Sequence, residues 1–294
     1  MRVGFTMLVI VGMMIVLGSV LGGFTMAGGH IGALIHPSEI VTIGGAALGA
    51  MVIMSPLSTL KAMVVGIMQS LKGSPYGKAA YEDLFKLLYQ LLNKAKRDGL
   101  LALESHVENP QQSTIFNRYP GLTNNHHVCD FIAGALRPVL DGSVTSEQLE
   151  ILLEQEIAAG EREHHQPIDV LGKTADGLPG FGIVAAVLGI VVTMEHISGP
   201  VEEIGEKVGA ALVGTFLGIL MSYGFLAPLV VKLELMGAAE TNFLRAIATT
   251  VNGFLSKLPP KVAVDAARRG LPSECRPSGE ELAKLLKEVD TYNE

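Results

Sequence analysis

Four long apolar runs divide the chain. The first covers residues 3–26 and the second residues 40–54, and neither contains a charged residue. The third and fourth, residues 177–194 and 208–231, also lack Asp, Glu, Lys and Arg. Because about 20 apolar residues of helix span the hydrocarbon core of a bilayer, this pattern predicts an all-α membrane protein with four transmembrane helices.

The first apolar run has an alternative interpretation. It follows Met1-Arg2 and could be a signal peptide with a cleavage site near residues 26–29. We favour a first membrane helix because three further spans follow. The paired glycines at Gly22-Gly23 and Gly28-Gly29 are expected to break this helix at its far side. Glu39 precedes the second run, and we expect it at the membrane interface, where its charge reaches water.

A polar segment separates the second and third runs. Its clearest helical stripe consists of Leu84, Leu87, Leu88, Leu91 and Leu92. A second helix is expected to start at Thr145, with Gln148 completing a capping box. Lysines lie beside this segment and are nearly absent from the short loops between spans, so the positive-inside bias places the segment and both chain ends in the cytoplasm. The expected organisation is residues 1–56 with spans one and two, 57–176 as a helical cytoplasmic domain, 177–231 with spans three and four, and 232–294 as a cytoplasmic helical tail.

The composition narrows the possible functions. The chain is 49% hydrophobic with mean hydropathy +0.40, as expected for a multi-span protein, and its net charge of −7 argues against a nucleic-acid partner. Cys129 and Cys275 match no metal or redox spacing. Adjacent histidines, as in His126-His127 and His164-His165, point apart, so no metal site is expected. The chain has no recognisable catalytic signature, so we expect no catalytic residues, no cofactor and no enzymatic activity.

Small residues and a proline mark both the third and the fourth run. At helical spacing the third run carries Gly182, Ala186, Gly189 and Thr193, and the fourth carries Ala211, Thr215, Gly218 and Ser222. Pro179 and Pro228 lie toward the cytoplasmic ends of these runs. Small side chains let helices approach closely in lipid, and prolines bend helices or free carbonyl groups. A packed membrane helix with a tolerated kink explains the same pattern.

The third and fourth runs also share an absence, since neither contains a titratable side chain in its core. Ion and proton pathways through membranes normally use such groups. The protein therefore either conducts nothing, or conducts only together with a partner that supplies a carboxylate.

Several motifs along residues 18–278 resemble, in the same order, those of one family. They lie at residues 178–189, 213–220, 223–228, 99–104, 108–110, 259–260 and 273–278. With the four spans and the large inner loop, they resemble the MotA family of flagellar motor stator subunits.

The resemblance implies an assembly. A homo-oligomeric ring, expected to hold five copies, would surround a dimer of MotB in the bacterial inner membrane. MotB would supply the titratable aspartate and a peptidoglycan anchor. The proton motive force, with no cofactor, would drive the ring against the rotor protein FliG.

The resemblance also implies roles along the ion path. Pro179 and Pro228 would couple conformational change to protonation of the aspartate, and Thr215 and Tyr223 would lie toward the path. Ala186 stands where sodium-driven relatives tend to carry threonine, which favours use of protons.

A second group of residues is implied at the rotor. Glu104 matches the acidic rotor-contacting residue of the family. The expected arginine falls on Lys96, with Arg97 beside it, and either could make the contact, although Lys lacks the planar fork of Arg. Glu156 fits a further acidic position or a salt bridge. Each exposed charge would contribute only weakly to binding the rotor, so several would have to act together. The alternative is that these charges form a solvated surface with no partner.

Two rival interpretations differ in kind. The related ExbB/TolQ class also forms a ring around a partner aspartate, but it has three spans, and the motifs of the fourth span argue against it. A membrane scaffold that conducts nothing would need no partner carboxylate.

Overall fold

All regular elements of the protein are helical. The computed structural model describes residues 3–291, with side chains from Leu8 onward, and no strand occurs within that range. The longer helices are α1 (Val3–Met26), α2 (Pro37–Met54), α3 (Leu57–Lys72), α4 (Lys78–Asp98), α7 (His126–Leu140), α8 (Ser146–Glu195), α9 (Val201–Ile219), α10 (Ala227–Leu255), α11 (Pro260–Arg269) and α12 (Gly279–Asp290). The shorter ones are η1 (Ile31–Leu34), η2 (Leu100–Leu103), α5 (Glu104–Glu108), η3 (Pro110–Gln112), η4 (Phe116–Arg118), α6 (Pro120–Thr123) and the π-helix η5 (Leu220–Leu226).

Four helical stretches are long and apolar enough to cross a membrane, which confirms the predicted fold class. They lie at Leu8–Met26, Ile31–Met54, Ser146–Glu195 and Val201–Leu255. The first helix runs to Met26, so the expected break at Gly22-Gly23 is wrong. The chain leaves the helix after Met26 and turns at Gly28. The φ of Gly28 is 87°, a left-handed value that glycine adopts readily because it lacks a β-carbon.

The chain packs as two compact units. The membrane unit comprises Met1–Ser74 and Glu163–Met236, and the polar unit comprises Pro75–Arg162 and Gly237–Glu294. Residues 57–74, 163–176 and 232–236, which the sequence placed with the polar segments, therefore pack with the membrane helices. An apolar cluster that joins Met63 of α3 to Ile168, Leu171 and Leu233 accounts for this difference.

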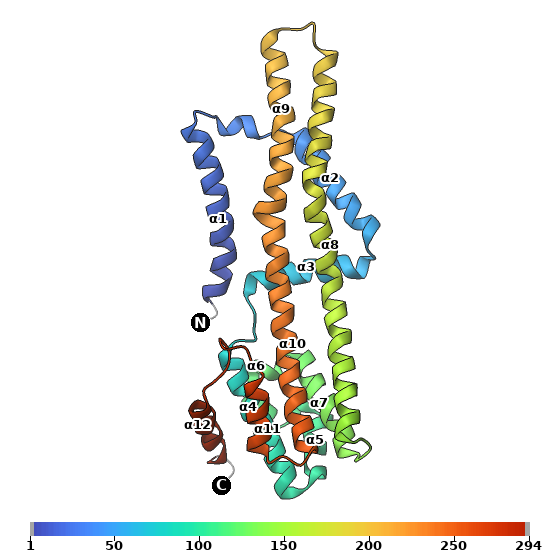
Figure 1. The fold of residues 1–294 in the computed structure, drawn as a ribbon, viewed down its shortest axis with the longest axis vertical. Coiled ribbons are helices and arrows are strands. Elements are labelled where there is room, and N and C mark those ends of the chain that lie inside the picture. The colour runs from blue at the N-terminus through green and yellow to red at the C-terminus, as the bar shows by residue number, and fades with distance from the viewer. Residues whose placement is uncertain (1–2, 292–294) are drawn as a thin grey trace. The chain divides into compact units, whose positions relative to one another are not determined.

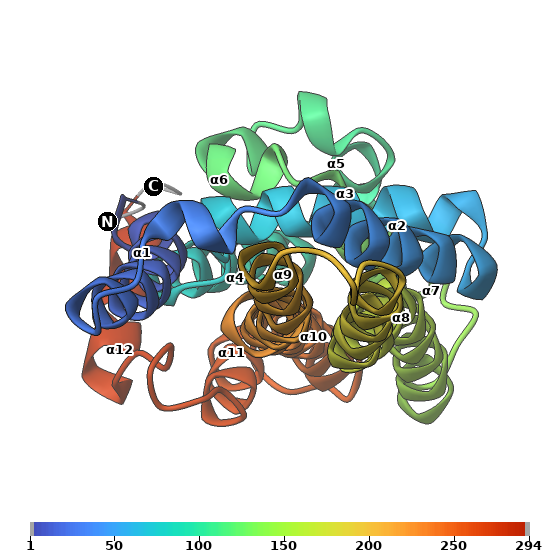
Figure 2. The same cartoon turned by 90° about the horizontal axis from the view of Figure 1, so that it is seen from above.

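In the membrane unit, α8 and α9 lie side by side, and α2 begins beside them (Figures 1 and 2). The amphipathic helix α3 runs across α8 and α10 and leaves apolar side chains such as Leu57 and Val64 exposed. A helix of this kind suits the membrane surface, where one face meets lipid and the other meets water or protein.

Helix α8 is continuous over 50 residues and includes Pro167 and Pro179 in its interior. The sequence predicted a cytoplasmic helix and a separate span, whereas the two form one element. The predicted helix start is confirmed, because Thr145 N–H donates to Gln148 Oε1 at 3.0 Å and Gln148 N–H donates to Thr145 Oγ1 at 3.3 Å.

The polar unit has its own apolar core around α4. All five leucines of the predicted stripe are 0% exposed. Four of these leucines, all but Leu92, belong to one apolar cluster that includes side chains of α7, α8, α10, α11 and α12. Ser278 caps α12, since its Oγ accepts from Glu281 N–H at 3.1 Å while Glu281 Oε2 accepts from Ser278 N–H at 2.7 Å.

Candidate functional site

The close contact between α8 and α9 organises the membrane unit. We call it the glycine seam, and it consists of Gly182 and Gly189 on α8 with Ala211, Gly214 and Gly218 on α9. A β-carbon added to Gly182 would lie 2.8 Å from the carbonyl oxygen of Gly214, and one added to Gly218 would lie 2.6 Å from that of Leu178. At Gly189 the added atom would lie 2.9 Å from Ala211 Cβ. The small residues of both runs therefore bring the two backbones into contact.

Three of the predicted ion-path residues adjoin the glycine seam. The backbone nitrogen of Ala186 would lie 3.4 Å from a β-carbon on Gly214, and Thr215 Cα would lie 3.3 Å from one on Gly182. Pro179 directly follows Leu178, which meets Gly218. Pro179, Ala186 and Thr215 are all half-buried. The structure thus brings these three residues to one helix pair, and their role in ion flow stays a prediction.

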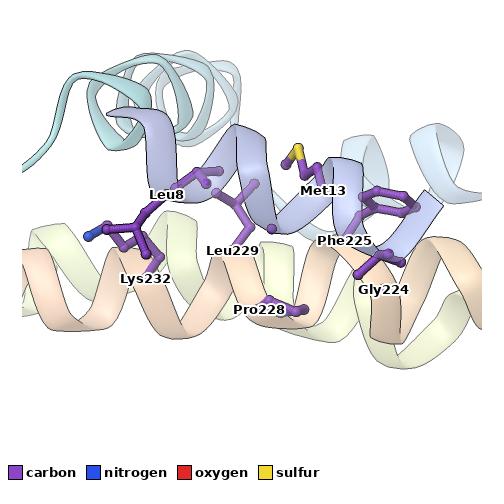
Figure 3. A pocket seen from close by; sticks show the side chains of 10 residues that line it. Leu8, Met13, Gly224, Phe225, Pro228, Leu229 and Lys232 are labelled. Atoms are coloured by element: carbon purple, nitrogen blue, oxygen red, sulfur yellow. The ribbon is translucent and has the colours of Figure 1, made fainter. Parts of the chain in front are cut away.

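Tyr223 and Pro228 lie outside the glycine seam. Tyr223, in η5, is 64% exposed. Pro228 lines an apolar pocket of about 350 Å³ between α1 and the η5–α10 region. Figure 3 shows Leu8 and Lys232 at one end of this pocket and Phe225 with Gly224 at the other.

The π-helix η5 directly precedes the turn of α10 that holds Pro228. A proline has no amide hydrogen to donate to the carbonyl four residues earlier, here Gly224, so the regular α-helical bonding cannot continue through this point. π-helical turns inside longer helices are frequent at functional sites. Within η5, Ser222 is fully buried and its Oγ has no hydrogen-bond partner among the described residues.

Glu39 reaches the glycine seam and is buried there, so the expectation that its charge reaches water is wrong. It stands in the first turn of α2 and is only 6% exposed. A β-carbon on Gly214 would lie 2.6 Å from Glu39 Oε2. The absence of any side chain on Gly214 makes room for the carboxyl group. Sequence reasoning missed this site, and its one signal was an acidic residue at the border of an apolar run.

The predicted rotor-contact residues all lie on the surface of the polar unit. Lys96 and Arg97 stand in the last turn of α4, and Glu104 opens α5. Gly99 turns the chain between them with a φ of 88°. Glu156 lies on α8, where local desolvation raises its carboxyl pKa while His127 acts to lower it. The predicted exposure of Lys96, Arg97 and Glu104 is confirmed, and Glu156 is exposed as well. Contact of these four side chains with a rotor remains a prediction.

One histidine of the two doublets, His127, pairs with a carboxylate. His127 Nδ1 lies 2.8 Å from Glu240 Oε1, and this hydrogen bond raises the pKa of His127. In the part of the chain that the structure describes, no three His, Cys, Asp or Glu side chains gather as metal ligands would. Cys129 is buried, which raises its pKa to about 11 and disfavours the reactive thiolate.

Comparison with known proteins gives this architecture a family. Residues 10–99 match the motility protein A N-terminal model, and residues 123–244 match the MotA/TolQ/ExbB proton channel family. Motility protein A of Salmonella typhimurium is 38% identical over 98% of both chains, and that of Escherichia coli is 37% identical over 96% of both. The chain belongs to the motility protein A family. Chemotaxis protein LafT of Vibrio parahaemolyticus, 38% identical over 95% of this chain and 98% of its own, is a further relative.

The fold is shared with solved members of the motility protein A family. C. jejuni MotAB matches with a TM-score of 0.76 and 22% identity, covering 92% of this chain and 98% of that one. The Bacillus subtilis MotAB stator complex matches with a TM-score of 0.70 and 22% identity, covering 91% and 96%. The chain is thus a multi-span inner-membrane protein of a proton-channel family that serves flagellar motility, and that family is not one of enzymes.

Proposed function

We propose that this chain works in a stator as the ring-forming subunit that turns proton flow into torque. The observation that carries the proposal is the close contact between α8 and α9 in the membrane unit. The two apolar runs to which these helices contribute, residues 177–194 and residues 208–231, contain no charged side chain. In a chain of a proton-channel family, such a pair forms the wall of a pathway whose main titratable group comes from another protein.

The partner in this proposal is MotB. The two solved structures with this fold are MotAB complexes. A MotB dimer would supply the channel aspartate and the peptidoglycan anchor, and five copies of this chain would surround it. The chain itself would carry out no catalysis and hold no cofactor.

Protonation would drive the mechanism. A carboxyl group in the path is neutral with its proton and charged without it, and this change alters which conformation of the surrounding helices is favoured. Pro179 and Pro228 interrupt backbone bonding in the two helices that would respond. Thr215 and Tyr223 would face the path, and Ala186, which offers no hydroxyl group to a sodium ion, favours protons.

The polar unit would transmit the torque to the rotor. With both chain ends and this unit in the cytoplasm, the exposed side chains of Lys96, Arg97, Glu104 and Glu156 would meet FliG. This orientation follows from the lysines beside the polar segment.

Complementation of a motile bacterium that lacks its own motility protein A tests the proposal, with the chain expressed beside its MotB. Swimming speed should follow the proton motive force and not respond to sodium.

Pro179→Ala should abolish swimming while membrane insertion and flagellar filaments stay intact, because alanine restores a regular helix at this point. Pro167→Ala, at the other interior proline of α8, is the matched control. Normal swimming of the Pro179→Ala strain would refute the motor role, and sodium-dependent swimming would refute the choice of ion.

A further inference from the structure

Glu39 brings a carboxyl group into the part of the membrane unit that holds the proposed ion path. It is nine-tenths buried, and its Oε2 has no hydrogen-bond partner among the described residues. An ionised carboxylate without a partner is costly in such a place, and acidic residues inside membranes commonly mark routes for ions or protons.

The geometry places this carboxyl group where three helices meet. The position of a β-carbon on Gly214 would be 2.6 Å from Glu39 Oε2, 3.2 Å from Ala185 Cβ and 3.4 Å from the backbone nitrogen of Ala186. Thr215 is the next residue of α9. Glu39 of α2 therefore lies at the level of two proposed ion-path residues on α8 and α9. Figure 1 shows α2 beginning beside these helices.

Opposing influences act on the Glu39 carboxyl group. Burial disfavours its charged form. The N-terminal turn of α2, in which it stands, favours that form, and so does a protonated His36, which precedes α2 and is half-buried. A group that transfers protons needs both forms to be accessible, and these opposing influences supply that condition.

Other charged groups on the neighbouring elements stand farther along the chain. Within the membrane unit they include His30 before η1, Glu202, Glu203, Glu206 and Lys207 on α9, Asp169, Lys173, Asp176 and Glu195 on α8, His196 after it, and Lys61 and Lys72 on α3. Lys207, the nearest of these on α9, is two helical turns from Gly214, or about 10 Å. His36, three residues before Glu39, is the nearest titratable residue along the chain.

We propose that Glu39 is a proton-binding site that this chain itself contributes, upstream of the carboxylate of its MotB partner. The inference rests on the proposed function and on the orientation given there, which puts the start of α2 at the outer side. A hydronium ion would give its proton to the Glu39 carboxylate and leave as water. A water molecule on the path would then accept the proton, and the carboxylate would be restored.

The test measures single-motor rotation by the full complex in cells, at low load and near stall, over a range of external pH at constant proton motive force. Transfer rates limit the speed at low load, whereas the energy of each proton limits the torque near stall. Glu39→Gln keeps the shape of the side chain but cannot bind the proton. We expect its low-load speed to fall about tenfold, less than the ~10²-fold that positioned proton transfer supplies in enzymes, because water still carries protons. Stall torque should change little, and the dependence of speed on pH should disappear.

Controls separate this role from packing. Glu39→Asp keeps a titratable group and should recover part of the speed. Glu202→Gln removes an exposed carboxylate from the first turn of α9 and should change nothing. Unchanged low-load speed in Glu39→Gln would overturn the inference and leave the proposed function standing. An equal loss of speed and torque together with loss of complex from the membrane would assign Glu39 to packing and also overturn it.

Infrared difference spectra give an independent measurement if Glu39→Gln fails to assemble. The complex would be reconstituted in vesicles, with the channel aspartate of MotB replaced by asparagine. A protonated carboxylic acid that titrates there and is altered in Glu39→Asp supports the inference, and no such signal refutes it. Absence of motility with the unaltered chain would instead contradict the proposed function.

Discussion

Gly218 has no space for a side chain, and this gives the first prediction at the scale of single residues. A β-carbon there would lie 2.6 Å from Leu178 O and 2.9 Å from Gly182 Cα, and backbone atoms cannot rotate away as a flexible side chain can. Gly218→Ala should therefore push α8 and α9 apart and destabilise the membrane unit by about 1–3 kcal/mol, as overpacking typically does. Thermal unfolding of the purified complex should show a lower midpoint, and swimming should weaken.

Gly209→Ala on the same helix is the matched control. No atom lies within 4 Å of a β-carbon at Gly209, and alanine favours helix by up to about 1 kcal/mol over glycine. This variant should keep the unfolding midpoint or raise it. Equal midpoints for Gly218→Ala and the unaltered protein would show that the contact between α8 and α9 is looser than the structure indicates.

The π-helix η5 gives a prediction at the scale of elements. The glycine seam fixes the face of α9 before η5, and Leu233 fixes the face of α10 after it by packing with Ile168 and Leu171. A π-helix has more residues per turn than an α-helix, so the π-helical segment sets the rotation of the α10 face relative to the α9 face. Pro228→Ala restores an amide donor for Gly224 O and should let η5 move toward regular α-helix. Hydrogen–deuterium exchange in residues 220–230 should become slower, and torque should fall.

Pro167→Ala serves as the comparison for this element as well. Pro167 lies inside α8, in which the structure shows no π-helical segment. Its replacement should leave exchange in residues 220–230 unchanged. Unaltered exchange in Pro228→Ala would mean that side-chain packing, rather than the missing amide, holds η5 in its π form.

The elements also show how far the sequence alone could predict this fold. Apolar runs and the Leu84–Leu92 stripe depend on local periodicity, so the four spans and the core face of α4 were predictable. The continuity of α8 was not, because charged residues up to Asp176 divide its sequence into a polar part and an apolar part, and neither part indicates that one helix holds both. The π-helix depends on backbone bonding that the apolar pattern does not record.

The candidate site divides in the same way. Resemblance to a family pointed to Pro179 and Thr215, and it pointed to the exposed charges of the polar unit as well. The burial of Glu39 depends on Gly214, which is distant in sequence and leaves no local pattern around Glu39. Contacts of this kind appear only once the helices are packed.

At the scale of the whole molecule, the proposed contact with the rotor would consist of several weak interactions acting together. Lys96, Arg97 and Glu104 are exposed, and an exposed ion pair contributes only about 0.2–1 kcal/mol. Glu104→Lys should therefore reduce motor torque without abolishing it, and reversal of Lys96 and Arg97 to Glu in the same chain should remove most of it. A matching charge reversal on FliG should restore torque to Glu104→Lys, because the attraction then returns with opposite signs.

Asp141→Lys is the control, since Asp141 is exposed at the C-terminal cap of α7, where a cation is favourable. Single-motor torque measurements check all four strains, and wild-type torque in the triple reversal would assign these charges to a solvated surface rather than to the rotor.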